Sequence, residues 1–175
     1  MNEILARRLQ SYWRMEAANV ILVPALVVFV VLETGGVVSI PLLAPLAGNM
    51  LLLAIGACYW RITLLKVQGD DGPFNRWLPL LGRLQLPAAL GALASCAVAL
   101  IDVAQGDGSW PPERIALACT SALCALEYVN YYHVQLQHFD HAPDFRRLLR
   151  TGRFRPAHLA RDLAALRNRS TVRPN

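Results

Sequence analysis

The chain has 175 residues and a formal net charge of +5; 55% of its residues are apolar, and only 17% are charged. A soluble domain has about 25% charged residues and leaves roughly 30% of its surface in water after folding, which is too much to cover with side chains this apolar. The composition therefore argues against a soluble enzyme, a disordered segment and a nucleic-acid-binding module. We expect an all-α integral membrane protein.

Four stretches of the chain are almost free of charge and long enough to cross a bilayer, which takes about 20 mainly apolar residues in a helix. We predict spans at about 15–33, 41–62, 86–104 and 114–134. Together they form a four-transmembrane-helix bundle over 1–136, with a loop at about 63–85. Because three further spans follow the first, we interpret it as an uncleaved helix and not a signal peptide.

The distribution of basic residues predicts the orientation. The N-terminal arm, the loop after the second span and the tail hold 16 of the 17 Lys and Arg residues. Lys and Arg are retained on the cytoplasmic side of a membrane, so we expect both termini to be cytoplasmic. The excess of arginine, with a single lysine, indicates a GC-rich genome, and we expect a bacterial inner membrane.

All four cysteines lie inside the predicted spans, and none forms a C-x-x-C pair: Cys58, Cys96, Cys119 and Cys124. Thiol–disulfide exchange enzymes need accessible, activated thiols, so this class is not supported. We interpret the cysteines as small apolar packing residues.

Glu127 is the most informative residue, because an acid inside a span is expensive and must face other protein groups or a wet cavity. Asn130 and Tyr131 follow on the same side of the predicted helix. Arg61 is our candidate partner, since the second helix can continue to Lys66 and a long arginine side chain can reach inward. We predict an intramembrane polar cluster of Glu127, Asn130, Tyr131 and Arg61.

Two interpretations of that cluster remain open. A Glu–Arg pair with neighbouring amide and hydroxyl groups can simply set how the helices pack. Alternatively, the carboxylate can be a proton-responsive or cation-binding group in a transport path. Small-xxx-small patterns in the last two spans favour close helix packing, either inside one bundle or between copies in a homo-oligomer.

Residues 137–175 predict an Arg-rich amphipathic cytoplasmic tail with two short helices, the second starting at Pro156. Its leucines, Leu159, Leu163 and Leu166, form an apolar stripe surrounded by basic residues. Such a segment favours anionic phospholipid headgroups, with a protein partner as the alternative. The expected headgroup contacts are Arg146, Arg147, Arg150, Arg153 and Arg155. We expect no nucleic-acid partner.

His138 and His141 are weak candidates for a metal site, but their spacing matches no common metal motif, so we expect no metal or cofactor. No nucleophile with a nearby histidine is visible, so the sequence favours a non-enzyme. Three functional hypotheses remain: a structural or accessory membrane protein that binds a partner complex or lipid, a small oligomeric transporter or channel using Glu127, and a lipid-modifying enzyme at the cytoplasmic interface.

Overall fold

The computed structural model describes residues 2–106, 108–136, 146, 150 and 153–171. In this part of the chain the structure is all-helical and has no strand. The helices are α1 (Asn2–Glu33), α2 (Ile40–Val67), α3 (Gly72–Arg83), α4 (Gln85–Gln105), α5 (Pro112–Tyr132) and α7 (His158–Thr171). The all-helical prediction is confirmed.

Three helices are long and apolar enough to cross a membrane: α1 from Glu3 onward, α2 and α4. These contain the first three predicted spans. The fourth predicted span falls on α5, which has 21 residues, the same length as α4, and packs against α2 and α4. Polar residues near the end of α5, among them Glu127 and Asn130, make this helix less apolar than α1, α2 and α4.

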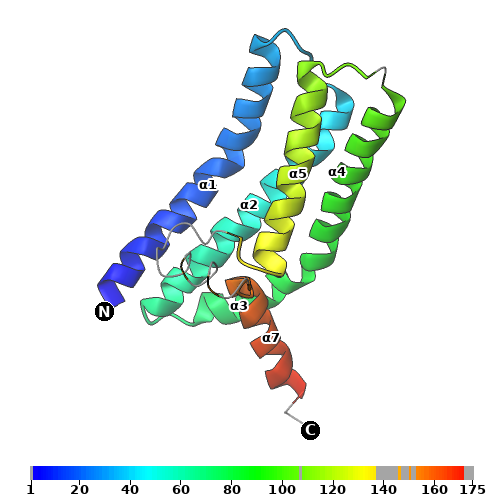
Figure 1. Cartoon of the computed structure of the whole chain (residues 1–175). Helices are drawn as coiled ribbons and strands as arrows, with labels where there is room; N and C mark the ends of the chain where they lie inside the picture. The colour runs from blue at the N-terminus through cyan, green and yellow to red at the C-terminus, as the bar shows by residue number, and fades with distance from the viewer. Residues whose placement is uncertain (1, 107, 137–145, 147–149, 151–152, 172–175) are drawn as a thin grey trace.

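α2 is the central helix and contacts α1, α3, α4 and α5 (Figure 1). The start of α1, the end of α2, and α3 and α7 all lie at one end of the molecule, here called the α7 end. The α1–α2 and α4–α5 connections lie at the opposite end. The folding therefore brings the three basic stretches of the sequence to the same end.

Local sequence explains most of the helix boundaries. Gly35 follows α1 with a φ of 81°, a conformation that only glycine adopts without strain. Prolines occupy the first turn of α2, α3 and α5, where a missing N–H leaves no hydrogen bond unmade. α2 continues past Arg61 to Val67 as predicted, whereas α1 begins well before the expected span, at Asn2.

The core has two parts. Near the opposite end, Val31, Leu42 and Leu117 are among the buried residues that join α1, α2 and α5. The larger part lies toward the α7 end and includes side chains of five helices: Leu52, Ile55, Tyr59 and Ile62 of α2, Phe74, Leu78 and Leu81 of α3, Ala88 and Ala92 of α4, Cys124, Tyr131 and Tyr132 of α5, and Leu159 and Leu163 of α7. The loop helix α3 and the tail helix α7 are thus parts of the core.

A short backbone pairing attaches α7 to the rest of the molecule. The N–H of Gln135 donates to the carbonyl of Arg155 at 2.8 Å, and the N–H of Ala157 donates to that of His133 at 3.0 Å. Leu159 and Leu163 are buried, and Leu166 packs against the same cluster. The leucine stripe therefore contacts protein, which differs from the expected docking of this stripe on lipid. The first predicted tail helix lies almost wholly outside the described residues.

Candidate functional site

The carboxyl group of Glu127 on α5 lies near that of Glu16 on α1, and the two groups interact electrostatically. Glu16 is buried, with 5% of its surface exposed. One oxygen of Glu127, Oε2, is buried and has no hydrogen-bond partner. Two helices thus bring two acids together in the interior of the helix packing.

The hydroxyl of Tyr131 belongs to the same cluster and interacts with both carboxyl groups. The side chain is buried, with 4% of its surface exposed, and its hydroxyl has no partner in hydrogen-bonding geometry. It lies directly against the backbone of α2 at Gly56, where a Cβ atom would be 2.2 Å from the hydroxyl oxygen. A glycine at this position is what allows the tyrosine to enter.

A cavity of about 40 Å³ adjoins the cluster and reaches the first turn of α7. A cavity needs about 10–15 Å³ to hold a water molecule, so there is space for a few waters and no more. Residues of four helices and of the segment after α5 line it: Glu16, Tyr59, Trp60, Asn130, Tyr131, Gln135, His158 and Leu159. Of these lining residues, Glu16 and Tyr131 are also the ones that interact with Glu127.

Arg61, our candidate partner for Glu127, is placed elsewhere. Its guanidinium lies over the ring of Trp13, 5.0 Å from the ring centroid, and the side chain is exposed. Within the described residues, neither Glu127 nor Glu16 forms an ion pair. The stacking places the arginine charge on the surface of the molecule, away from the two acids.

The Asn130 side chain lies beside Glu127. Its amide group interacts with the Glu127 carboxyl, and its Oδ1 accepts a hydrogen bond from the N–H of Leu136 at 2.9 Å. The residue therefore connects the acidic cluster to the segment that leads away from α5.

Glu16 is the member of the cluster that the sequence analysis missed. A signal was present, because position 16 lies inside the predicted span of 15–33, next to a long uncharged run. An acid at the edge of a span is normally interpreted as a solvated boundary residue. Its burial follows from the packing of α1 on α2 and α5, which the sequence does not specify.

Asn49 forms a second buried polar contact, nearer the opposite end. Its Nδ2 donates to the carbonyl of Pro45 on the same helix and to that of Thr120 on α5, both at 2.9 Å. The contact fixes α2 against α5 without any charged group.

At the α7 end, hydrogen bonds and ring contacts hold α7 over the cavity. The hydroxyl of Tyr59 donates to Oδ2 of Asp162 at 2.7 Å. The ring of Trp60 lies between those of Tyr12 and His158, with centroid distances of 5.4 and 5.6 Å. Partial burial lowers the pKa of His158, and the nearby charge of Arg161 lowers it further.

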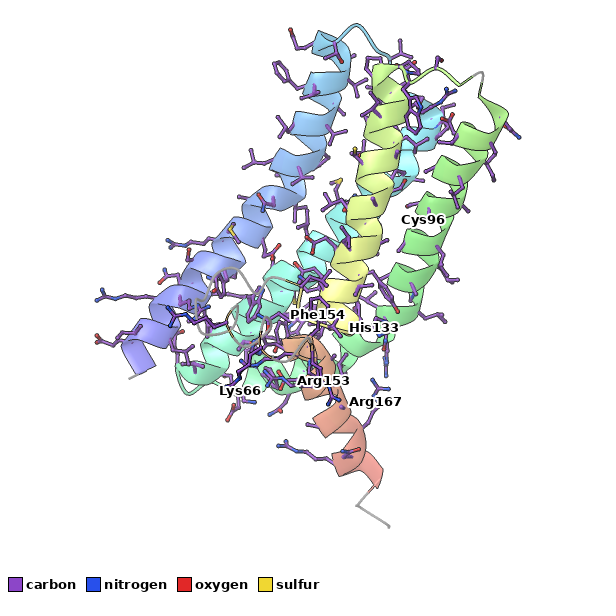
Figure 2. The ribbon with its side chains drawn as sticks, in the orientation of Figure 1. Lys66, Cys96, His133, Arg153, Phe154 and Arg167 are labelled. Atoms are coloured by element: carbon purple, nitrogen blue, oxygen red, sulfur yellow. The ribbon has the colours of Figure 1, made fainter. Side chains whose placement is uncertain are left out.

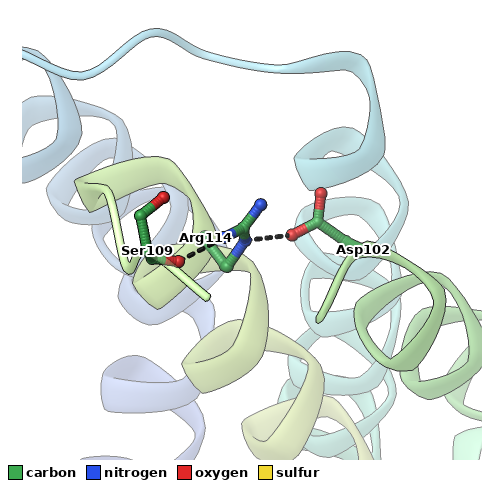
Figure 3. Close-up of polar contacts among 3 residues, drawn as sticks. All are labelled: Asp102, Ser109 and Arg114. Atoms are coloured by element: carbon green, nitrogen blue, oxygen red, sulfur yellow. Dashed lines mark hydrogen bonds and ion pairs between the residues drawn. The ribbon is translucent and has the colours of Figure 1, made fainter. Parts of the chain in front are cut away.

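The opposite end carries the one ion pair of the described residues. Nε of Arg114 is 2.9 Å from Oδ2 of Asp102, and the same guanidinium donates to the carbonyl of Ser109 (Figure 3). This arginine is the basic residue that does not lie in the three basic stretches. These contacts join α4 to α5 beside the segment that connects them. The charge of Arg114 is therefore neutralised within the protein.

The structure describes four of the five arginines that we predict to contact lipid headgroups. Arg146, Arg150, Arg153 and Arg155 are exposed, and Figure 2 shows Arg153 at the α7 end of the molecule, where Phe154, Lys66, His133 and Arg167 also lie. Arg147, His138 and His141 lie outside the described residues. The described part of the chain contains no group of three potential metal ligands. The four cysteines are all free thiols.

Comparisons of the chain with protein-family models, with curated proteins and with solved structures find no match.

Proposed function

We propose that this chain is a structural or accessory protein of a bacterial inner membrane, and that its cytoplasmic face binds anionic phospholipid headgroups or a membrane-complex partner. α5 is the fourth span in this proposal. Its 21 residues, at ~1.5 Å per residue, match the ~30 Å hydrocarbon thickness. Both termini are cytoplasmic, because the basic stretches meet at the α7 end.

The observation that carries the proposal is the way α7 is attached. Its leucines pack on α3 and the other helices, so the arginines around them are held on a folded surface next to the predicted membrane boundary. Each basic residue near an anionic membrane surface contributes about 1 kcal/mol of binding. The adjoining cavity holds only a few waters, which supports a binding surface over a substrate chamber.

Native mass spectrometry of the purified protein tests the lipid contact. We expect the wild type to retain phosphatidylglycerol in preference to phosphatidylcholine. A variant with Arg146, Arg150, Arg153 and Arg155 changed to glutamine should lose this preference. Arg114→Gln at the opposite end is the matched control and should keep it; equal retention by all three proteins would contradict the proposal.

Cysteine labelling tests the topology. In a background without the four native cysteines, a cysteine at exposed Trp110 should react with an impermeant maleimide added outside the cell. A cysteine at Gln68 should react only after the membrane is opened. Labelling of the Gln68 position from outside would reverse the orientation.

A second candidate is a small oligomeric transporter or channel, and the convergence of Glu16 and Glu127 favours it. The cavity beside these acids has space for only a few waters, so a transport path requires a homo-oligomer. Transport of a fluorescent or radiolabelled cation in proteoliposomes, compared between wild type and Glu127→Gln, separates this candidate from the accessory protein.

A further inference from the structure

We propose that Glu16 and Glu127 form a proton-binding site in which the two carboxyl groups hold one proton between them and the Tyr131 hydroxyl donates to the carboxylate that stays ionised. The site does not depend on whether the protein is an accessory protein or a transporter. It assigns a ligand, the proton, to the polar cluster between α1, α2 and α5.

The first argument is electrostatic. Two carboxylates in a site of low dielectric constant repel each other, so ionising the second beside the first is costly near neutral pH. Only 5% of the Glu16 surface is exposed, and Oε2 of Glu127 is fully buried. Either a cation or a proton has to compensate the second negative charge.

The second argument is that the basic side chains near the cluster have other contacts. On α1, Nε of Arg8 donates to the hydroxyl of Tyr12 at 2.6 Å. On α2, Arg61 lies over Trp13, and Lys66 lies over the ring of Phe74. α4 contains no basic residue at all.

Among the residues that the structure describes, the titratable neighbours on α5 and α7 do not supply the missing charge either. Arg114, the only basic residue of α5, is paired with Asp102 at the opposite end. On α7, Arg161 lies against His158, and Asp162 accepts from Tyr59. The Cys124 thiol, a neutral group, is also near Glu127.

Tyr131 supplies the independent sign of a ligand. Its hydroxyl is buried in contact with the α2 backbone at Gly56 and faces both acids, but it makes no hydrogen bond of good geometry to either. A buried hydroxyl without a partner is disfavoured, and an ionised carboxylate is its best acceptor. The singly protonated pair provides that acceptor and still keeps the total charge at one.

The cavity provides the route for the proton and limits the size of the ligand. It reaches from Glu16 and Tyr131 to His158 at the start of α7. A hydronium ion in this water-sized space transfers one proton to a carboxylate, which leaves a carboxylic acid and a neutral water. At about 40 Å³ the space is far below that of an organic ligand.

Infrared titration of the protein in nanodiscs tests the proposal, because a protonated carboxyl group has a carbonyl band that a carboxylate lacks. We expect the wild type to keep one such band at pH 7, where an ordinary glutamate, with a pKa of about 4.3, is ionised. Glu16→Gln and Glu127→Gln should each lose it, since glutamine takes the place of the protonated member of the pair.

Glu113→Gln is the matched control. Glu113 also has a buried carboxylate oxygen without a partner, but it lies at the start of α5, away from the cluster. We expect this variant to keep the band. Absence of the band in the wild type, or its survival in both Glu16→Gln and Glu127→Gln, would overturn the proposal. Loss of the band on adding Na⁺ at constant pH would overturn it too, because the ligand would then be the metal ion.

Tyr131→Phe keeps the test valid if a glutamine variant fails to fold. The phenyl ring preserves the packing and removes only the donor to the remaining carboxylate. We expect the second proton to bind at a pH about one unit higher, since a hydrogen bond to a charged group favours the ionised form by that order. An unchanged titration would show that the hydroxyl does not contact the pair.

Discussion

The hydroxyl of Tyr131 lies so close to the backbone of Gly56 that a methyl group on that glycine would stand 2.2 Å from the oxygen. The contact joins the centre of α2 to the last turn of α5. It also places the phenol beside the carboxyl groups of Glu16, which is buried, and Glu127, which is partly buried. A single glycine thus determines whether the polar cluster can form.

Gly56→Ala should destabilise the protein by about 1–3 kcal/mol, the usual cost of overfilling a packed core. Thermal unfolding in detergent measures the effect. Gly91→Ala on α4 is the matched control, because nothing lies within 4 Å of a Cβ atom there. The control should be neutral or slightly stabilising, since alanine favours a helix over glycine. Equal effects of the two changes would contradict the close contact.

Arg61 and Glu127 should behave as independent residues. Arg61→Ala should lower the free energy of unfolding by about 0.5–1 kcal/mol, the contribution of an exposed cation–π contact, here with Trp13. In a double-mutant cycle with Glu127→Gln, the two effects should add within about 0.5 kcal/mol. The cycle of Glu16→Gln with Glu127→Gln should not be additive, because these two groups interact. Coupling between Arg61 and Glu127 would restore the ion pair that the sequence suggested.

Tyr59→Phe should loosen α7 by removing its hydrogen bond to Asp162. A hydrogen bond to a charged group contributes about 1.5–3 kcal/mol. Limited trypsin digestion measures the change, since the arginines of α7 become cleavable when the helix detaches. Asp162→Asn keeps an acceptor oxygen and should be cleaved more slowly than Tyr59→Phe. Identical digestion of Tyr59→Phe and wild type would argue against this role.

His158 should make the protein less stable in mild acid. The folded state lowers the pKa of this residue, so it disfavours the protonated ring relative to the unfolded chain. The pKa of an unfolded histidine is about 6.5. The neutral ring of His158 therefore makes its full contribution to the free energy of unfolding above that pH, and this contribution is lost as the pH falls through the lower pKa of the folded state. Unfolding temperatures from pH 8 to 5 should decline less in His158→Gln than in the wild type. Parallel declines would assign the acid sensitivity to other groups.

Asn49→Leu should remove the hydrogen bond between α2 and the carbonyl of Thr120. Hydrogen bonds between membrane helices contribute about 0.6 kcal/mol on average and at most about 1.7, so we expect a loss in that range. Ser95→Ala is a fitting comparison, because the Ser95 hydroxyl donates to the carbonyl of Gly91 in its own helix, and its polar contact with another helix is with the Cys124 thiol, a weak hydrogen-bonding group. Chemical unfolding in mixed micelles compares the two, and a larger loss for Ser95→Ala would contradict the role of Asn49.

Much of the fold follows from local sequence. Uncharged runs predict the positions of α1, α2, α4 and α5, because the hydrocarbon thickness sets the length of an apolar helix. Pro and Gly mark the helix ends, since both act through the backbone of their own turn. The leucine stripe of α7 was recognisable from helical spacing alone.

Which surfaces meet was decided only in three dimensions. Sequence spacing indicates that Glu127 needs a partner, and charge and reach favour Arg61 for that role. In the structure, Trp13 lies beside the arginine and Glu16 lies beside the acid. Likewise, the leucines of α7 pack on α3 and not on lipid. Periodicity shows that a face is apolar or polar, but the rotation and order of the packed helices determine what that face contacts.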